Sequence, residues 1–149
     1  MLILAIDTAL DACAAGVLDT EAGKLIGQES QAMKRGHAEA LMPLIARVIE
    51  QSGIAFAALD RIAVTTGPGS FTGLRVGLSA ARGIALAANK PVVGLTTLTA
   101  YAAPLVSETS SPNDAARRAL VGDSAGAPGI IAVVGSSYRP RFRRWSHYG

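Results

Sequence analysis

The chain has 149 residues, half of them hydrophobic, and a formal net charge of +3. This length and composition predict one domain with an ordinary hydrophobic core. A single cysteine, Cys13, excludes an internal disulfide framework and a cysteine-based zinc site. Residues 1–107 carry eight basic and eight acidic side chains, so the whole positive excess lies in residues 108–149. The main part of the chain therefore has no electrostatic sign of binding nucleic acid by itself.

The chain starts with a short apolar run, residues 1–6, that ends at Asp7. No basic residue precedes this run, and it is too short to cross a bilayer. We therefore expect neither a signal peptide nor a membrane span. A reducing, cytoplasmic location is the default expectation for such a chain.

Three strands are predicted first, joined by short turns, over residues 2–8, 12–18 and 24–30. A helix follows, because five apolar residues share one helical face: Leu41, Leu44, Ile45, Val48 and Ile49. Gly53 is expected to end this helix. Pro43 requires that the helix either begins close to it or is kinked there.

Strands and helices then alternate. We predict a strand, a tight turn, a helix with Ser70 as its N-cap, and a further strand, over residues 61–66, 67–69, 71–88 and 92–95. A third helix is expected to start at Thr96 or Thr97. The order strand-strand-strand-helix-strand-helix-strand-helix indicates an α/β fold with a mixed sheet and helices on both faces. This is the ribonuclease H-like half-unit that actin-like (ASKHA) ATPases use twice.

The predicted helix over residues 71–88 carries a column of small residues at every fourth position: Gly73, Gly77, Ala81 and Ala85. Each glycine costs a helix about 1 kcal/mol relative to alanine, which suggests a compensating close approach of another backbone. From spacing alone, tight packing on the chain's own sheet is the favoured interpretation. Pairing with another helix is the alternative, with Leu74 and Leu78 supplying apolar contact beside the column. Arg75 and Arg82 share a different face, where we expect solvent or a partner.

A nucleotide or phosphate site is a weaker hypothesis, and it rests on Asp7, Thr8, Gly69 and Ser70. Free N–H groups at a helix start attract anions. However, no Lys-Ser/Thr pair follows the glycines, and the turn after Asp7 contains no glycine to cradle a phosphate. A structural turn role for Asp7 is the favoured interpretation.

No catalytic residue and no metal site is predicted. His37 lacks a second histidine four residues later, where Leu41 stands. The segment around Ser70 lacks the G-x-S-x-G frame of a nucleophile elbow.

Three segments together resemble the TsaB (YeaZ) family: ILAIDTA at the start, Arg35-Gly36-His37-Ala38-Glu39 with Leu41 and Pro43, and GPGSFTGLRVGLSAARGIA from Gly67. The resemblance covers residues 1–106. It implies a non-catalytic partner of the TsaD subunit that acts with the TsaE ATPase. Together these proteins transfer a threonylcarbamoyl group to N6 of the adenosine next to the anticodon of tRNA.

The resemblance also implies a partner interface. In that family the first two helices pair with those of TsaD, or with a second TsaB copy as a homodimer. The residues expected at this interface are Leu41, Ile45, Val48, Gly73, Leu74, Gly77, Leu78 and Ala81. We expect no cofactor of the chain's own, ATP or ADP only at the interface with TsaD, and contact with tRNA only through the complex.

Residues 107–149 do not resemble the second α/β half with which that family continues. We expect residues 1–106 to form the ribonuclease H-like domain and residues 107–149 to be an atypical tail, either disordered or read from a shifted frame. Two other functions stay open: an actin-like-fold ATPase or glycoprotease-type peptidase acting by itself, and a defective fragment without function.

Overall fold

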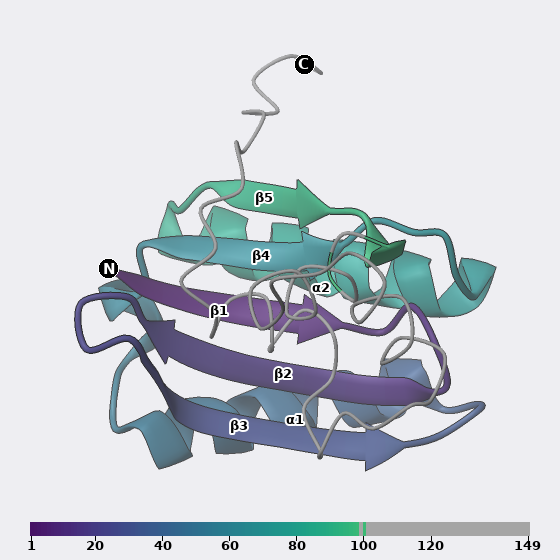
Figure 1. Cartoon of the computed structure of the whole chain (residues 1–149), viewed down its shortest axis with the longest axis horizontal. Coiled ribbons are helices and arrows are strands. Elements are labelled where there is room, and N and C mark those ends of the chain that lie inside the picture. The colour runs from purple at the N-terminus through teal and green to yellow at the C-terminus, as the bar shows by residue number, and fades with distance from the viewer. Residues whose placement is uncertain (99, 101–149) are drawn as a thin grey trace, which may run out of the picture.

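The computed structural model describes residues 1–98 and 100. They form a five-stranded sheet with two α-helices and one short 3-10 helix (Figure 1). In chain order the elements are β1 (Leu2–Asp7), β2 (Ala12–Asp19), β3 (Lys24–Ala32), α1 (His37–Ser52), η1 (Phe56–Ala58), β4 (Arg61–Thr65), α2 (Phe71–Ala88) and β5 (Val92–Leu95). The tail predicted over residues 107–149 lies outside the described residues.

The sheet has the strand order β3-β2-β1-β4-β5. β1, β2 and β3 are antiparallel neighbours, whereas β4 is parallel to β1 and β5 is parallel to β4. In the central strand, Ile6 pairs with Ala15 on one side and with Val64 on the other. This mixed sheet confirms the predicted α/β fold class, and the element order is the one expected from the sequence.

Both described α-helices cover the same face of the sheet and lie behind it in the view of Figure 1. Alternate residues of the central strand, Leu4 and Ile6, join the core under these helices, whereas Ile3 and Ala5 belong to a second cluster on the opposite face. That second cluster includes Ala100, which is helical together with Thr97 and Leu98. The third helix therefore starts at Thr97, on the face away from α1 and α2.

Glycines in the left-handed region bound α1: Gly36 at its start has φ 87° and Gly53 at its end has φ 68°. Gly53 thus ends the helix as predicted. Pro43 lies inside the helix, so α1 continues through a residue that has no N–H to donate.

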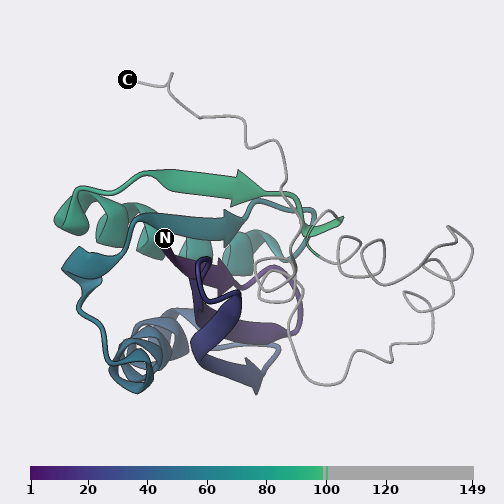
Figure 2. The ribbon, with the colours of Figure 1, turned by 60° about the vertical axis from the view of Figure 1, so that its left-hand side comes forward.

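The boundaries of α2 follow from its caps. The Ser70 hydroxyl accepts a hydrogen bond of 3.2 Å from the backbone N–H of Gly73, and Asn89 ends the helix with φ 53°. The sequence predicted α2 and β5 with these bounds. It did not predict η1, which connects α1 to β4 (Figure 2). Phe56 of η1 packs against the core between the helices and the sheet.

None of the helices in residues 1–98 has the length and apolarity required to cross a membrane.

Candidate interaction site

The column of small residues on α2 faces the chain's own sheet. A Cβ atom at Gly73 would clash with the backbone carbonyl of Thr8, and one at Gly77 would clash with the Thr8 hydroxyl. Ala81 and Ala85 are buried in the core beneath the same helix. The column therefore lets α2 approach the end of β1 closely, which is the interpretation that the spacing favoured.

Six of the residues expected at the partner interface pack within the chain itself. Leu41, Ile45 and Val48 are at most 1% exposed and form part of the core between α1 and the sheet. Gly73, Gly77 and Ala81 are buried against β1 and β4. Because these residues already pack within the chain, a partner can reach only the outward faces of α1 and α2. The apolar spacing identified both helices, and the residues that it marks lie on the faces buried within the chain.

Leu74 and Leu78 are half-buried beside the column. Leu78 packs against the core, and a methyl carbon of Leu74 lies close to Gly67 in the turn before α2. They shield the edge of α2 and its N-terminal turn.

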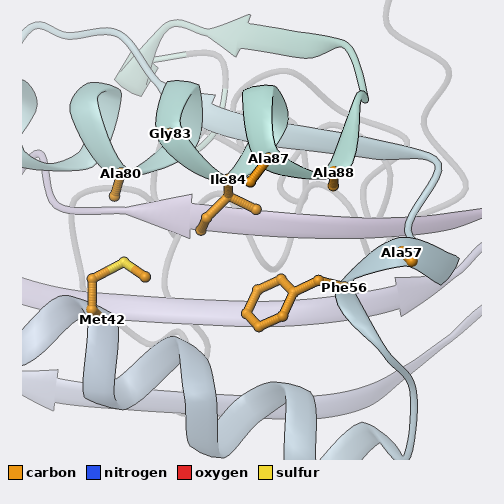
Figure 3. Close-up of a pocket in the computed structure, with 8 residues that line it drawn as sticks. All are labelled: Met42, Phe56, Ala57, Ala80, Gly83, Ile84, Ala87 and Ala88. Atoms are coloured by element: carbon orange, nitrogen blue, oxygen red, sulfur yellow. The ribbon is translucent and has the colours of Figure 1, made fainter.

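An apolar groove lies between α1, η1 and α2. It encloses about 530 Å³ and is lined by Met42, Phe56, Ala57, Ala80, Gly83, Ile84, Ala87 and Ala88. In Figure 3 the side chains of Met42, Phe56 and Ile84 point into one space, while α2 presents the small residues along the opposite wall. Every lining residue is apolar, so the groove fits a hydrophobic side chain and offers no group for acid–base chemistry or metal binding.

Gly83 is the unusual residue of this groove. It is exposed, and a Cβ built on it would meet nothing within 4 Å. Gly73 and Gly77 have contacts within the chain that exclude a side chain, but Gly83 has none among the described residues. A glycine in an exposed helix interior costs about 1 kcal/mol relative to alanine. No contact within the described residues requires a glycine at position 83, whereas close approach by another molecule would require one.

Large apolar side chains are exposed on both helices, and one of them, Met42, also lines the groove. Met42 is 47% exposed on α1, and Phe71 and Leu86 are 74% and 86% exposed on α2. Such exposed apolar surface beside a groove is typical of protein interaction sites. These residues were not predicted from the sequence, although one signal was available: Gly83 is a helical glycine outside the four-residue column.

The residues of the phosphate hypothesis do meet, around the carboxyl end of β1, and the chain itself uses the polar groups of Thr8 and Ser70. The Thr8 hydroxyl donates to the Gly73 carbonyl at 2.6 Å, and the Ser70 N–H donates to the Ala9 carbonyl at 2.7 Å. Gly69 packs so closely on Ala9 that a Cβ would clash with the Ala9 carbonyl. These contacts fix the turn before α2.

Asp7 acts as a turn residue in the structure. Its Oδ1 accepts hydrogen bonds from the Ala9 N–H at 3.1 Å and from the Thr65 hydroxyl at 2.9 Å. Its Oδ2 is buried and has no hydrogen-bond partner among the described residues, and the same holds for the hydroxyl of Thr97. Both groups lie near the carboxyl edge of the parallel strands.

The two other residues considered for chemistry are buried. Burial, and then the negative charges of Asp7 and Glu29, raise the pKa of the Cys13 thiol to about 11, so the thiol stays protonated and unreactive near neutral pH. His37 is the first residue of α1 and is 6% exposed. Within residues 1–98 and 100, no three His, Cys, Asp or Glu side chains are grouped as a metal site would require.

Comparison with known proteins places this fold in a family. The family model described as TsaD, tRNA N6-adenosine threonylcarbamoyltransferase, matches residues 25–138. The tRNA threonylcarbamoyladenosine biosynthesis protein TsaB of Escherichia coli is 35% identical over 98 residues, which are 66% of this chain and 41% of that protein. The structure of YeaZ from Pseudomonas aeruginosa matches with a TM-score of 0.61 and 31% identity, covering 72% of this chain and 47% of the other.

The Thermus thermophilus RuvC structure is similar in fold alone. It matches with a TM-score of 0.54 and 20% identity over 91% of this chain and 90% of that chain. The chain spans 41% of the length of the TsaB proteins of Escherichia coli and Haemophilus influenzae, and 55% of the length of a similar Mycobacterium tuberculosis protein.

Proposed function

The chain belongs to the TsaD-type tRNA N6-adenosine threonylcarbamoyltransferase family and is similar to its TsaB/YeaZ members, and on this premise we propose that it is a helix-pairing subunit in the synthesis of threonylcarbamoyladenosine in tRNA. In this proposal it has no catalytic activity alone. It supports a TsaD-type partner, with TsaE as a further component and tRNA contacted through the complex. Any ATP or ADP is bound at the interface with the partner.

The observation that carries the proposal is the apolar groove between α1 and α2 with Gly83 at its rim. A helix laid across Gly83 can approach the α2 backbone, because no side chain separates them. An apolar side chain of that helix would then enter the space between Met42, Phe56 and Ile84. Burying apolar surface there is favourable by about 25 cal/mol per Å² before the cost of association is subtracted.

The polar contacts at the carboxyl end of β1 support a non-catalytic role. Thr8 and Ser70 hold the turn before α2, and Gly69 is packed on Ala9. The alternative of a self-sufficient ATPase needs these groups free for phosphate. Tight ATP binding by the purified chain, lost in Asp7→Ala, would favour that alternative.

The test is to mix the full chain with the threonylcarbamoyltransferase (TsaD-type) chain encoded in the same genome and to measure the dissociation constant. Gly83→Leu should weaken the complex at least about tenfold, because the added side chain holds the helices apart. Gln51→Leu, on an exposed part of α1 outside the groove, is the matched control and should leave the constant within about twofold. The absence of any complex between the TsaD-type chain and the wild-type chain would refute the proposal. Self-association through the same groove would show instead that the groove binds a second copy of this chain.

A further inference from the structure

A second surface of α2, on the side of the helix away from the groove, alternates apolar and cationic side chains. Its residues follow one another at intervals of three or four positions and are Phe71, Arg75, Leu78, Arg82 and Leu86. This spacing places all five on one narrow stripe of the helix surface, which we call the outer stripe. Phe71 and Leu86 at its two ends are 74% and 86% exposed, both arginines are exposed, and Leu78 is half-buried.

The two arginines of the outer stripe have no acidic partner. Neither Arg75 nor Arg82 forms an ion pair with any residue of the described part of the chain, and α2 itself contains no acidic residue. Arg75 lies instead over the ring of Phe71, with its guanidinium carbon 5.2 Å from the ring centroid. Such a contact orients the guanidinium group and leaves its N–H groups able to bind a carboxylate. The outer stripe therefore presents two cations without a counter-charge.

The apolar members of the outer stripe indicate that a protein helix, rather than RNA, covers it. A nucleic-acid surface needs a broad basic patch, whereas residues 1–107 carry as many acidic as basic side chains. Burial of Phe71 and Leu86 requires apolar side chains from the occupant. Intervals of three and four residues are those along which one helix packs lengthwise on another. From Phe71 to Leu86 such a contact would extend over about 22 Å.

We infer that the outer stripe docks a helix of another protein whose facing side alternates apolar residues with carboxylates. Its apolar side chains would cover Phe71, Leu78 and Leu86, and its carboxylates would pair with the two arginines between them. This inference goes beyond the proposed function, because the groove is lined from a different side of α2 by Ala80, Ile84 and Ala87.

A second copy of this chain fits the outer stripe less well. Two outer stripes packed against each other would bring four arginines into one seam without an acid, which is repulsive. The α1 helix of a second copy does carry exposed acids, Glu39 and Glu50. They are eleven residues apart, about 16 Å along a helix, whereas Arg75 and Arg82 are separated by about 10 Å.

The test uses the full chain and a synthetic helical peptide of about 28 residues, with leucine and glutamate alternating along one side. A second peptide, with glutamine in place of each of those glutamates, is the control for apolar contact alone. Fluorescence anisotropy of the labelled peptides measures the dissociation constants. The glutamate peptide should bind at least about tenfold more tightly than the glutamine peptide at roughly 0.05 M salt, and less than about threefold more tightly at roughly 0.5 M salt.

Charge reversal locates the binding. Arg75→Glu/Arg82→Glu should remove the preference for the glutamate peptide, and a peptide with lysine at the same positions should bind this variant at least about tenfold more tightly than it binds the wild-type chain. Lys24→Glu/Lys34→Glu changes the net charge equally at exposed sites beside β3, at the opposite edge of the sheet from β5, and should preserve the preference within about twofold. Urea unfolding checks that each variant folds.

Three results would overturn the inference. The first is equal binding of the glutamate and glutamine peptides to the wild-type chain. The second is a preference for the glutamate peptide that survives charge reversal at Arg75 and Arg82. The third is self-association of the wild-type chain that charge reversal abolishes, because a second copy would then cover the outer stripe. None of these results bears on the proposed function, which the Gly83→Leu measurement decides.

Discussion

The hydroxyl of Thr8, at the end of β1, donates a 2.6 Å hydrogen bond to the backbone carbonyl of Gly73 in the first turn of α2. Thr8 is fully buried, and the absence of a side chain at Gly73 and Gly77 is what lets the helix come this close. The glycine column thus fixes α2 onto its own sheet. Partner binding must use other faces of the same helix.

Removing the Thr8 hydroxyl tests this attachment. Thr8→Val keeps the side-chain volume but loses the hydrogen bond, and we expect the free energy of unfolding in urea to fall by about 1–2 kcal/mol. The matched control is Thr20→Val, whose hydroxyl donates to the Met1 carbonyl at an exposed position. Its effect should stay below about 0.5 kcal/mol. Equal effects of the two variants would contradict the anchoring role of Thr8.

The glycines of α2 should divide into two classes. Gly77→Ala would force a Cβ into the Thr8 hydroxyl, and we expect it to lower the free energy of unfolding by about 1–3 kcal/mol. Gly83→Ala adds a Cβ in open space and should raise that free energy by about 0.5–1 kcal/mol through helix propensity. Urea unfolding of the full chain measures both changes. A destabilising Gly83→Ala would show that Gly83 has an intramolecular role.

The raised pKa of Cys13 predicts a pH dependence of stability. In the unfolded chain the thiol ionises near its ordinary pKa of 9.0, whereas the folded value is about 11, so the unfolded state releases its proton first as the pH rises. The free energy of unfolding should therefore fall between pH 9 and 11, by at most about 1.4 kcal/mol per pH unit from this group. Cys13→Ala should remove that part of the slope. The same slope in both proteins would show that other groups cause it.

Most of the fold could be predicted from the sequence, because the local signals agreed. Ser70 and Asn89 bound α2, Gly53 ends α1, and the apolar runs identified the strands. The position of η1 was missed, since residues 56–58 carry no cap or periodic pattern. The spacing could not decide whether Pro43 starts or interrupts α1, and the structure places it inside.

The site was harder to predict, because the role of a helix face depends on which elements pack against it. The four-residue spacing of Gly73 and Gly77 indicates close packing but does not name the packed object. That object is Thr8, 65 residues from Gly73 in sequence and brought there by the pairing of β1 with β4. Gly83 and Phe56 come together only because η1 turns back beside α2. The groove therefore depends on tertiary contacts that a single sequence does not specify.

The central claim, that a TsaD-type partner covers the groove at Gly83, is tested most directly by thiol labelling. Cys13 is buried and protonated, so it should not react with maleimide. In the Gly83→Cys variant, labelling therefore reports on the introduced thiol. We predict that the maleimide labelling rate of Gly83→Cys falls at least about tenfold when the threonylcarbamoyltransferase chain is added at saturation, whereas the rate of Gln51→Cys stays within about twofold. An unchanged labelling rate at Gly83→Cys, under conditions where the complex is shown to form, would contradict the claim.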